Sequence, residues 1–225
     1  PSDDLPLDIL STIMEGGLDV AIKAGIPILG GHTLTDSVPK YGLVVTGRVE
    51  KNNLTLNSTA KAGDVLILTK PLGLGIVSTA IKKDEAPSFI VDEAVSTMTH
   101  LNKGATEAMN SIGVHACTDI TGYVLLGHLL EICQASQVSA TLEFNTTPLI
   151  QGVYELAQKG FIPGGTKRNM DYVSSHVNFS KTISKEQQYL LADAQTSGGL
   201  LISVAKDKAE ELQNTLNENG CLTNA

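Results

Sequence analysis

Positive charge is scarce in this sequence. Its 16 lysines and arginines are outnumbered by 24 aspartates and glutamates, which gives a formal net charge of −8 at pH 7, and no cluster of basic residues occurs. A general binder of nucleic acid or of an anionic membrane carries a basic stripe. We therefore expect neither nucleic acid nor a membrane among the partners.

Long apolar runs and a cysteine framework are also missing. Runs such as VLIL and LLI are far below the roughly 20 residues of a membrane span, and the residues PSDDLP are acidic and polar, unlike a signal peptide. The three cysteines, Cys117, Cys133 and Cys221, are too widely spaced for a disulfide framework or a zinc site. These absences favour the cytoplasm.

Hydrophobic residues make up 42% of the chain and charged residues 18%, a composition that fills a globular core. Their periodicity predicts alternating helices and strands, and hence an α/β or α+β fold with mixed sheets and packed helices. Helices are predicted over 10–25, 73–83, 91–111, 122–134, 150–159, 187–194 and 207–219. Strands are predicted over 27–29, 41–49, 64–70, 115–118, 140–144 and 200–204.

A polar stretch at 50–63 (EKNNLTLNSTAKAG) is the candidate domain boundary. It separates two predicted domains, 1–57 and 58–225. The first holds one helix, weakened by a glycine pair, and two short strands, which are too few for an independent sheet.

Three glycine-rich motifs lie beside predicted strand or helix ends: GGHT from Gly30, CTDITGYVLLGHLLE from Cys117 and QTSGGLLISV from Gln195. None matches the dinucleotide fingerprint G-x-G-x-x-G or the Walker loop. Glycines nevertheless let backbone N–H groups approach an anion closely, and adjacent helix N-termini add a favourable dipole.

Each motif taken alone also has a structural interpretation. The glycine pairs suit tight turns, and His32 suits a loop histidine bonded to backbone. Asp119 suits the N-cap of the following helix. His128 and Glu131 have a spacing that metal sites use, but no further ligand completes a site, so we interpret the pair as structural.

Taken together, the motifs carry a resemblance. The segments GGHTLTDSVPKYGLVVTGRV, KAGDVLILTKPLGLGI, TDITGYVLLGHLLEI, GFIPGGTKRN and DAQTSGGLLISV occur in this order. In sequence and spacing they closely resemble selenophosphate synthetase (selenide, water dikinase), of the aminoimidazole-ribotide-synthetase-like superfamily. The resemblance runs along essentially the whole chain.

The resemblance implies a fold of two α/β domains, of which the N-terminal one forms a homodimer that shares an ATP site. The implied reaction converts ATP, selenide and water to selenophosphate, AMP and phosphate, with Mg²⁺ on the polyphosphate. Gly31, His32 and Thr33 match the family loop that reaches the nucleotide. Asp119 matches a magnesium-binding aspartate, and carboxylate oxygen suits this hard cation.

The family's catalytic cysteine or selenocysteine, its nearby lysine and further magnesium-binding aspartates lie in a segment that has no counterpart in these 225 residues. The catalytic residues are therefore unknown, and none of the three cysteines takes that role. We expect the chain to be a piece of a longer enzyme, shortened at its start and slightly after CLTNA, with little activity alone.

Two alternatives stay open. A sister enzyme of the superfamily, such as an aminoimidazole ribotide synthetase or a thiamine-phosphate kinase, would share weaker versions of these motifs. A non-catalytic paralogue would keep the fold and the dimer without the chemistry.

Overall fold

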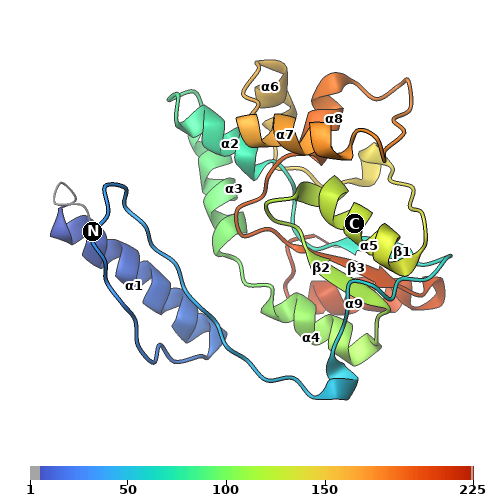
Figure 1. The fold of residues 1–225 in the computed structure, drawn as a ribbon, viewed down its shortest axis with the longest axis horizontal. Helices are drawn as coiled ribbons and strands as arrows, with labels where there is room; N and C mark the ends of the chain where they lie inside the picture. The colour runs from blue at the N-terminus through green and yellow to red at the C-terminus, as the bar shows by residue number, and fades with distance from the viewer. Residues whose placement is uncertain (1–5, 224) are drawn as a thin grey trace. The chain divides into compact units, whose positions relative to one another are not determined.

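The computed structural model describes residues 6–223 and residue 225. It divides after Asn52 into two compact units, drawn from blue to red along the chain in Figure 1. In the first unit, the described residues form one long helix, α1 (Leu7–Ala24), followed by an extended segment that ends in the short 3-10 helix η1 (Lys51–Asn53) at the boundary.

Helix α1 confirms the helix predicted from the periodicity over 10–25. It ends at Gly25, whose left-handed backbone (φ 75°) returns its N–H to the carbonyls of Ala21 and Ile22. The strands predicted over 27–29 and 41–49 are wrong: no described residue of 26–50 is in a strand. Strands exist only through paired backbone groups, and apolar side chains such as Val44, 98% exposed, lack a covering layer among the described residues.

The second unit is built on an antiparallel sheet of three strands in the order β1-β3-β2. Strand β3 (Leu200–Val204) lies in the centre, between β1 (Val65–Leu68) and β2 (Ala116–Asp119). The register places Ile202 opposite Ile67 on one side and opposite Cys117 on the other. The predicted combination of helices and strands is confirmed, and both ladders are antiparallel.

Alternating side chains of the sheet face two different helix layers. Ile67 and Ile202 pack with α4 (Lys103–Ile112) and α9 (Ala209–Glu218), whereas Leu68 and Leu201 pack with α5 (Val124–Ser136). Figure 1 shows α5 on one side of the sheet and α4 and α9 on the other. The sheet is therefore covered on both faces, which explains the continuous apolar runs of its strands.

Four further helices form a third apolar cluster. They are α2 (Leu74–Ile81), α3 (Ser88–Thr99), α6 (Val153–Gln158) and α8 (Lys185–Leu191). Helix α7 (Gly164–Val173) contacts α5 and α8, and two 3-10 turns, η2 (Phe144–Thr146) and η3 (Lys206–Lys208), complete the unit.

Two predictions in this unit are corrected, and one helix was not predicted. The long helix over 91–111 is two helices, because the chain turns extended at His100 between α3 and α4. The strand over 140–144 is absent, and η2 follows instead. Helix α7 was not predicted, because its first turn is the pair Gly164-Gly165 after Pro163, a composition typical of loops.

Candidate functional site

The predicted metal ligand Asp119 is the last residue of β2, where the strand leaves the sheet. Its side chain is exposed, and it lines an open hollow of about 430 Å³ together with Thr55, Leu56 and Asn57. One carboxylate oxygen, Oδ2, accepts a hydrogen bond of 2.7 Å from the Thr121 hydroxyl. The other, Oδ1, has no hydrogen-bond partner among the described residues, so it is available to a ligand.

Asp119 is not an N-cap. Helix α5 begins after Tyr123, and no side chain caps it among the described residues. The interpretation of Asp119 as a helix cap is therefore wrong, and the carboxylate has no assigned role in the fold beyond its bond with Thr121. The chain reaches α5 through Val124, a buried β-branched residue at φ 64°. Strain of this kind, about 1–3 kcal/mol, collects at functional loops.

The QTSGG motif packs directly against the loop that carries Asp119. Ile120 N–H donates to the Gly199 carbonyl (2.8 Å), and Gln195 N–H donates to the Thr121 carbonyl (3.1 Å). A Cβ atom placed on Gly198 would lie 1.8 Å from the Ile120 carbonyl oxygen. Glycine is required here because two backbones meet, which explains the glycine pair in physical terms.

A further motif, PGGTKRN, contacts the same loop. Asn169 of α7, from the PGGTKRN segment, donates to the Gly122 carbonyl at 3.0 Å. Thr166 of the same helix donates to the buried Asp193 carboxylate at 2.8 Å. The sequence placed these segments 40 or more residues from Asp119, and only the packing of α7 on α5 brings Asn169 to the loop.

Asp193 and Gln195 together satisfy the first N–H groups of α2. Asp193 Oδ2 accepts from Gly75 and Ile76, and Gln195 Oε1 accepts from Gly73 and Leu74. Burial raises the pKa of Asp193 to about 6, against the opposing hydrogen bonds from Thr166 and the helix. The D-A-Q of DAQTSGG is thus a helix cap supplied from a distant segment, a role that sequence alone did not reveal.

Lys70, two residues after the end of β1, is a second buried group that the sequence did not reveal. Its Nζ donates to the carbonyls of Thr97, His100 and Ser197 at 3.0, 2.6 and 2.8 Å. Burial lowers its pKa to about 8. The lysine ties the C-terminal end of α3 to the QTSGG loop, and this contact accompanies the break of the predicted long helix.

The predicted nucleotide-binding residues Gly31, His32 and Thr33 lie in the extended segment of the first unit, and all three are exposed. A Cβ added to Gly31 would meet nothing within 4 Å, and the backbone of Gly31 does not have a positive φ. Nothing in the described fold of this unit requires glycine there. Its space is therefore available to a ligand.

The three cysteines are free thiols. Burial and the charge of Asp119 raise the pKa of Cys117 to about 12, and burial raises the pKa of Cys133 and Cys221. A nucleophilic cysteine needs a lowered pKa. None of the three has the environment of an activated nucleophile.

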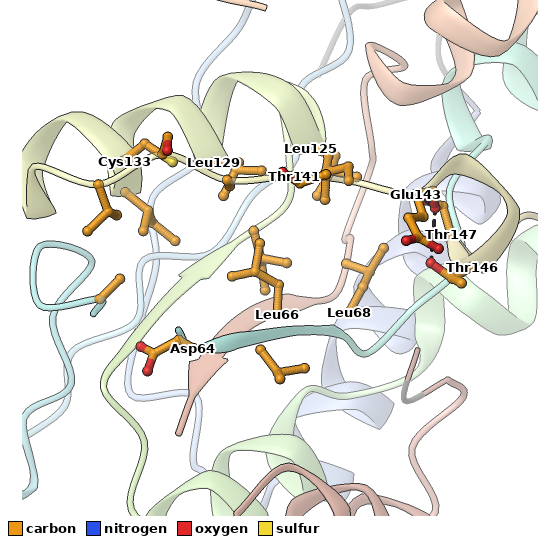
Figure 2. A pocket seen from close by; sticks show the side chains of 18 of the residues that line it. Asp64, Leu66, Leu68, Leu125, Leu129, Cys133, Thr141, Glu143, Thr146 and Thr147 are labelled. Atoms are coloured by element: carbon orange, nitrogen blue, oxygen red, sulfur yellow. Dashed lines mark hydrogen bonds between the residues drawn. The ribbon is translucent and has the colours of Figure 1, made fainter. Parts of the chain in front are cut away.

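A separate cavity of about 410 Å³ lies between β1 and α5. In Figure 2 the side chains of Leu66 and Leu68 from the strand and of Leu125 and Leu129 from the helix meet in it, with Glu143 at one end. Asp119 does not line it. Apolar walls with carboxylates at the margin do not suit a polyphosphate, so we do not place the nucleotide there.

The donor chemistry of Asp119 fits one oxygen ligand of a divalent cation such as Mg²⁺. Within residues 6–223 and 225, no group of three or more His, Cys, Asp or Glu side chains is arranged to hold a metal. Mg²⁺ is commonly bound through one or two carboxylates, with phosphate oxygens and water completing its shell. One exposed carboxylate with a free oxygen fits that pattern.

In the same described part of the chain, no helix is long and apolar enough to cross a membrane.

Comparison with known proteins identifies the class. The model of the family "AIR synthase related protein, C-terminal domain" matches residues 61–225, and the chain belongs to this family. Solved structures of similar fold include the hydrogenase maturation protein HypE (TM-score 0.68, 18% identity, covering 96% of this chain and 60% of that one) and thiamine-monophosphate kinase from Stenotrophomonas maltophilia (TM-score 0.52, 13% identity, covering 78% and 50%).

Curated relatives narrow the comparison to selenide, water dikinases. That of Caldanaerobacter subterraneus subsp. tengcongensis is 51% identical over 94% of this chain and 61% of its own length. That of Clostridioides difficile is 45% identical over 96% and 62%. That of Myxococcus xanthus is 49% identical over 92% and 59%. The resemblance predicted from the motifs is confirmed, and the chain spans about three fifths of the length of these relatives.

Proposed function

We propose that this chain is part of a selenide, water dikinase, which makes selenophosphate from selenide, ATP and water and releases AMP and phosphate. The observation that carries the proposal is 51% identity to such an enzyme over 94% of the chain. The convergence of TDITG, PGGTKRN and QTSGG on one loop supports it, because it gives these motifs a common structural purpose around Asp119.

In this proposal Asp119 contributes one oxygen ligand to a Mg²⁺ ion, and Gly31, His32 and Thr33 contact the nucleotide. The ion neutralises charge on the polyphosphate. The imidazole and hydroxyl of His32 and Thr33 can donate hydrogen bonds to phosphate oxygens, and Gly31 leaves space for them. A HypE structure in complex with ATP has a similar fold, so the fold accommodates this nucleotide.

The domain assignment is also a proposal: residues 1–57 end an ATP-binding domain that dimerises, and 58–225 form the C-terminal α/β domain. We further propose a homodimer that shares the ATP site and acts in the cytoplasm. Three unpaired cysteines suit a reducing compartment. We propose that the catalytic residues are not among these three cysteines and, because the chain spans 61% of the length of a similar enzyme, that the chain alone has little or no activity.

The test is Asp119→Asn in the intact enzyme, assayed as selenide-dependent ATP turnover with Mg²⁺. Asparagine keeps an oxygen for the Thr121 hydroxyl but loses the charge, so we expect an intact fold and loss of turnover. Turnover equal to that of the wild type would remove Asp119 from the site.

Two other functions are distinguished by the same assay. A sister enzyme, the alternative that the similar fold of thiamine-monophosphate kinase favours, would show no selenide-dependent turnover and would turn over ATP only when its own phosphate acceptor replaces selenide in the assay. A non-catalytic paralogue would keep the dimer and show no turnover at all.

A further inference from the structure

His128 in α5 has an unusual environment. It is 7% exposed, and its ring packs edge-on against Tyr123 with centroids 6.0 Å apart. Its Nδ1 is the one buried side-chain nitrogen or oxygen in the described part of the chain without a hydrogen bond. Glu131 Oε2 lies 3.5 Å from this nitrogen. This distance is within reach of an ion pair, but the two atoms form no hydrogen bond. Nδ1 of His128 is therefore without a hydrogen-bond partner.

The other ring nitrogen connects His128 to the loop of Asp119. His128 Nε2 lies 3.5 Å from Thr121 Oγ1, and the same hydroxyl is 2.7 Å from Asp119 Oδ2. A hydroxyl has one hydrogen, and the carboxylate, an acceptor only, takes it. Thr121 therefore faces His128 as an acceptor, and the hydrogen between them belongs to Nε2.

This tautomer also explains the unpaired atom. In the tautomer with its hydrogen on Nε2, Nδ1 has no hydrogen to donate to Glu131, which fits the absence of a hydrogen bond at this atom. A buried polar atom without a partner is costly. A leucine would fill this part of the apolar helix without that cost. The contact between Nε2 and the Thr121 hydroxyl is one that a leucine could not make.

We propose that His128 is a positioning residue that acts through the Thr121 hydroxyl to orient the Asp119 carboxylate for a divalent cation. The backbone of Thr121 is held in place by a hydrogen bond from Gln195 N–H to its carbonyl. Its hydroxyl, in contact with His128, binds Oδ2 and leaves Oδ1 free for a cation. The inference rests on the proposed role of Asp119 as a metal ligand. Removal of a residue that orients a metal ligand without contacting the metal typically lowers metal affinity by about 10–100-fold.

The test uses Mn²⁺ as a paramagnetic probe of the intact enzyme, with NMR line broadening of the amides at 118–123 as the readout. We expect His128→Leu to weaken Mn²⁺ binding there by about tenfold, with a melting temperature equal to or above that of the wild type. His128→Gln, whose amide can donate to Thr121, should retain binding. His176→Leu, at an exposed histidine, is the matched control and should change nothing.

A second pair of variants tests the route. Thr121→Val should weaken binding as His128→Leu does, Thr121→Ser should retain it, and the double variant Thr121→Val/His128→Leu should be no weaker than Thr121→Val alone. Additive losses, or wild-type affinity in His128→Leu, would overturn the positioning role and leave Asp119 a ligand. If His128→Leu does not fold, Thr121→Val and His128→Gln decide alone: wild-type affinity in Thr121→Val overturns the role. Unchanged broadening in Asp119→Asn would instead refute the metal proposal itself.

Discussion

Replacing Gly198 with alanine should destabilise the second unit strongly, because the new Cβ would lie 1.8 Å from the Ile120 carbonyl oxygen. One of the two backbones has to move by about 1 Å or more to relieve this contact. Overpacking of this kind costs about 1–3 kcal/mol. The movement also breaks or lengthens the bonds Ile120 N–H to Gly199 O and Gln195 N–H to Thr121 O, at about 1 kcal/mol each.

The expected loss in the free energy of unfolding is therefore about 3–5 kcal/mol, a large part of the 5–15 kcal/mol of a typical domain. Urea unfolding followed by circular dichroism measures it, and with a slope of about 2 kcal/mol/M the midpoint falls by about 1.5–2.5 M. Gly122→Ala, in the loop of Asp119, is the matched control. A Cβ there meets nothing within 4 Å, and the change should stay within about 0.5 kcal/mol. Equal midpoints for the two variants would refute the reasoning from close approach.

Three further predictions concern the nucleotide, the buried acid and the first unit. Gly31→Val should weaken ATP binding to the intact enzyme about tenfold or more. The melting temperature without nucleotide should not change, because only the ligand needs the space beside Gly31. Calorimetry measures both quantities, and a fall in the melting temperature would assign the glycine to the fold. Because burial raises the pKa of Asp193 from 3.8 to about 6, the folded state holds this proton more tightly, so this group's contribution to stability is greatest below about pH 4 and falls by about 3 kcal/mol as the pH rises to about 6. Asp193→Asn should abolish that fall, and an unfolding free-energy difference between wild type and variant that is constant over this range would contradict the shift. Amides of 6–52 should exchange with solvent faster than those of Val65–Leu68, since much of the apolar surface of this unit is exposed; equal protection in a monomer would refute the proposal that this part is an incomplete domain.

Local pattern was enough for the elements whose side chains repeat regularly. The apolar runs of β1 and β3 and the helical spacing of α1, α5 and α9 predicted the right type of element. A strand that is buried on both faces, or a helix that is buried on one face, has a regular pattern of apolar residues in its sequence. It failed over 41–49, where alternating apolar residues form no strand, and at His100, where the chain interrupts a continuous helical pattern. In both places the outcome depends on partners distant in the chain.

The sequence by itself determined the family, because its motifs keep their order and their residues, and it singled out Asp119 and the glycine pairs. The tertiary structure decided what those residues do for one another. Only packing places Gly198 against Ile120, and places Gln195 and Asp193 at the first turn of α2. The physical reason is that hydrogen bonds and close contacts act over a few ångströms in space, whereas the partners here are up to about 120 residues apart along the chain.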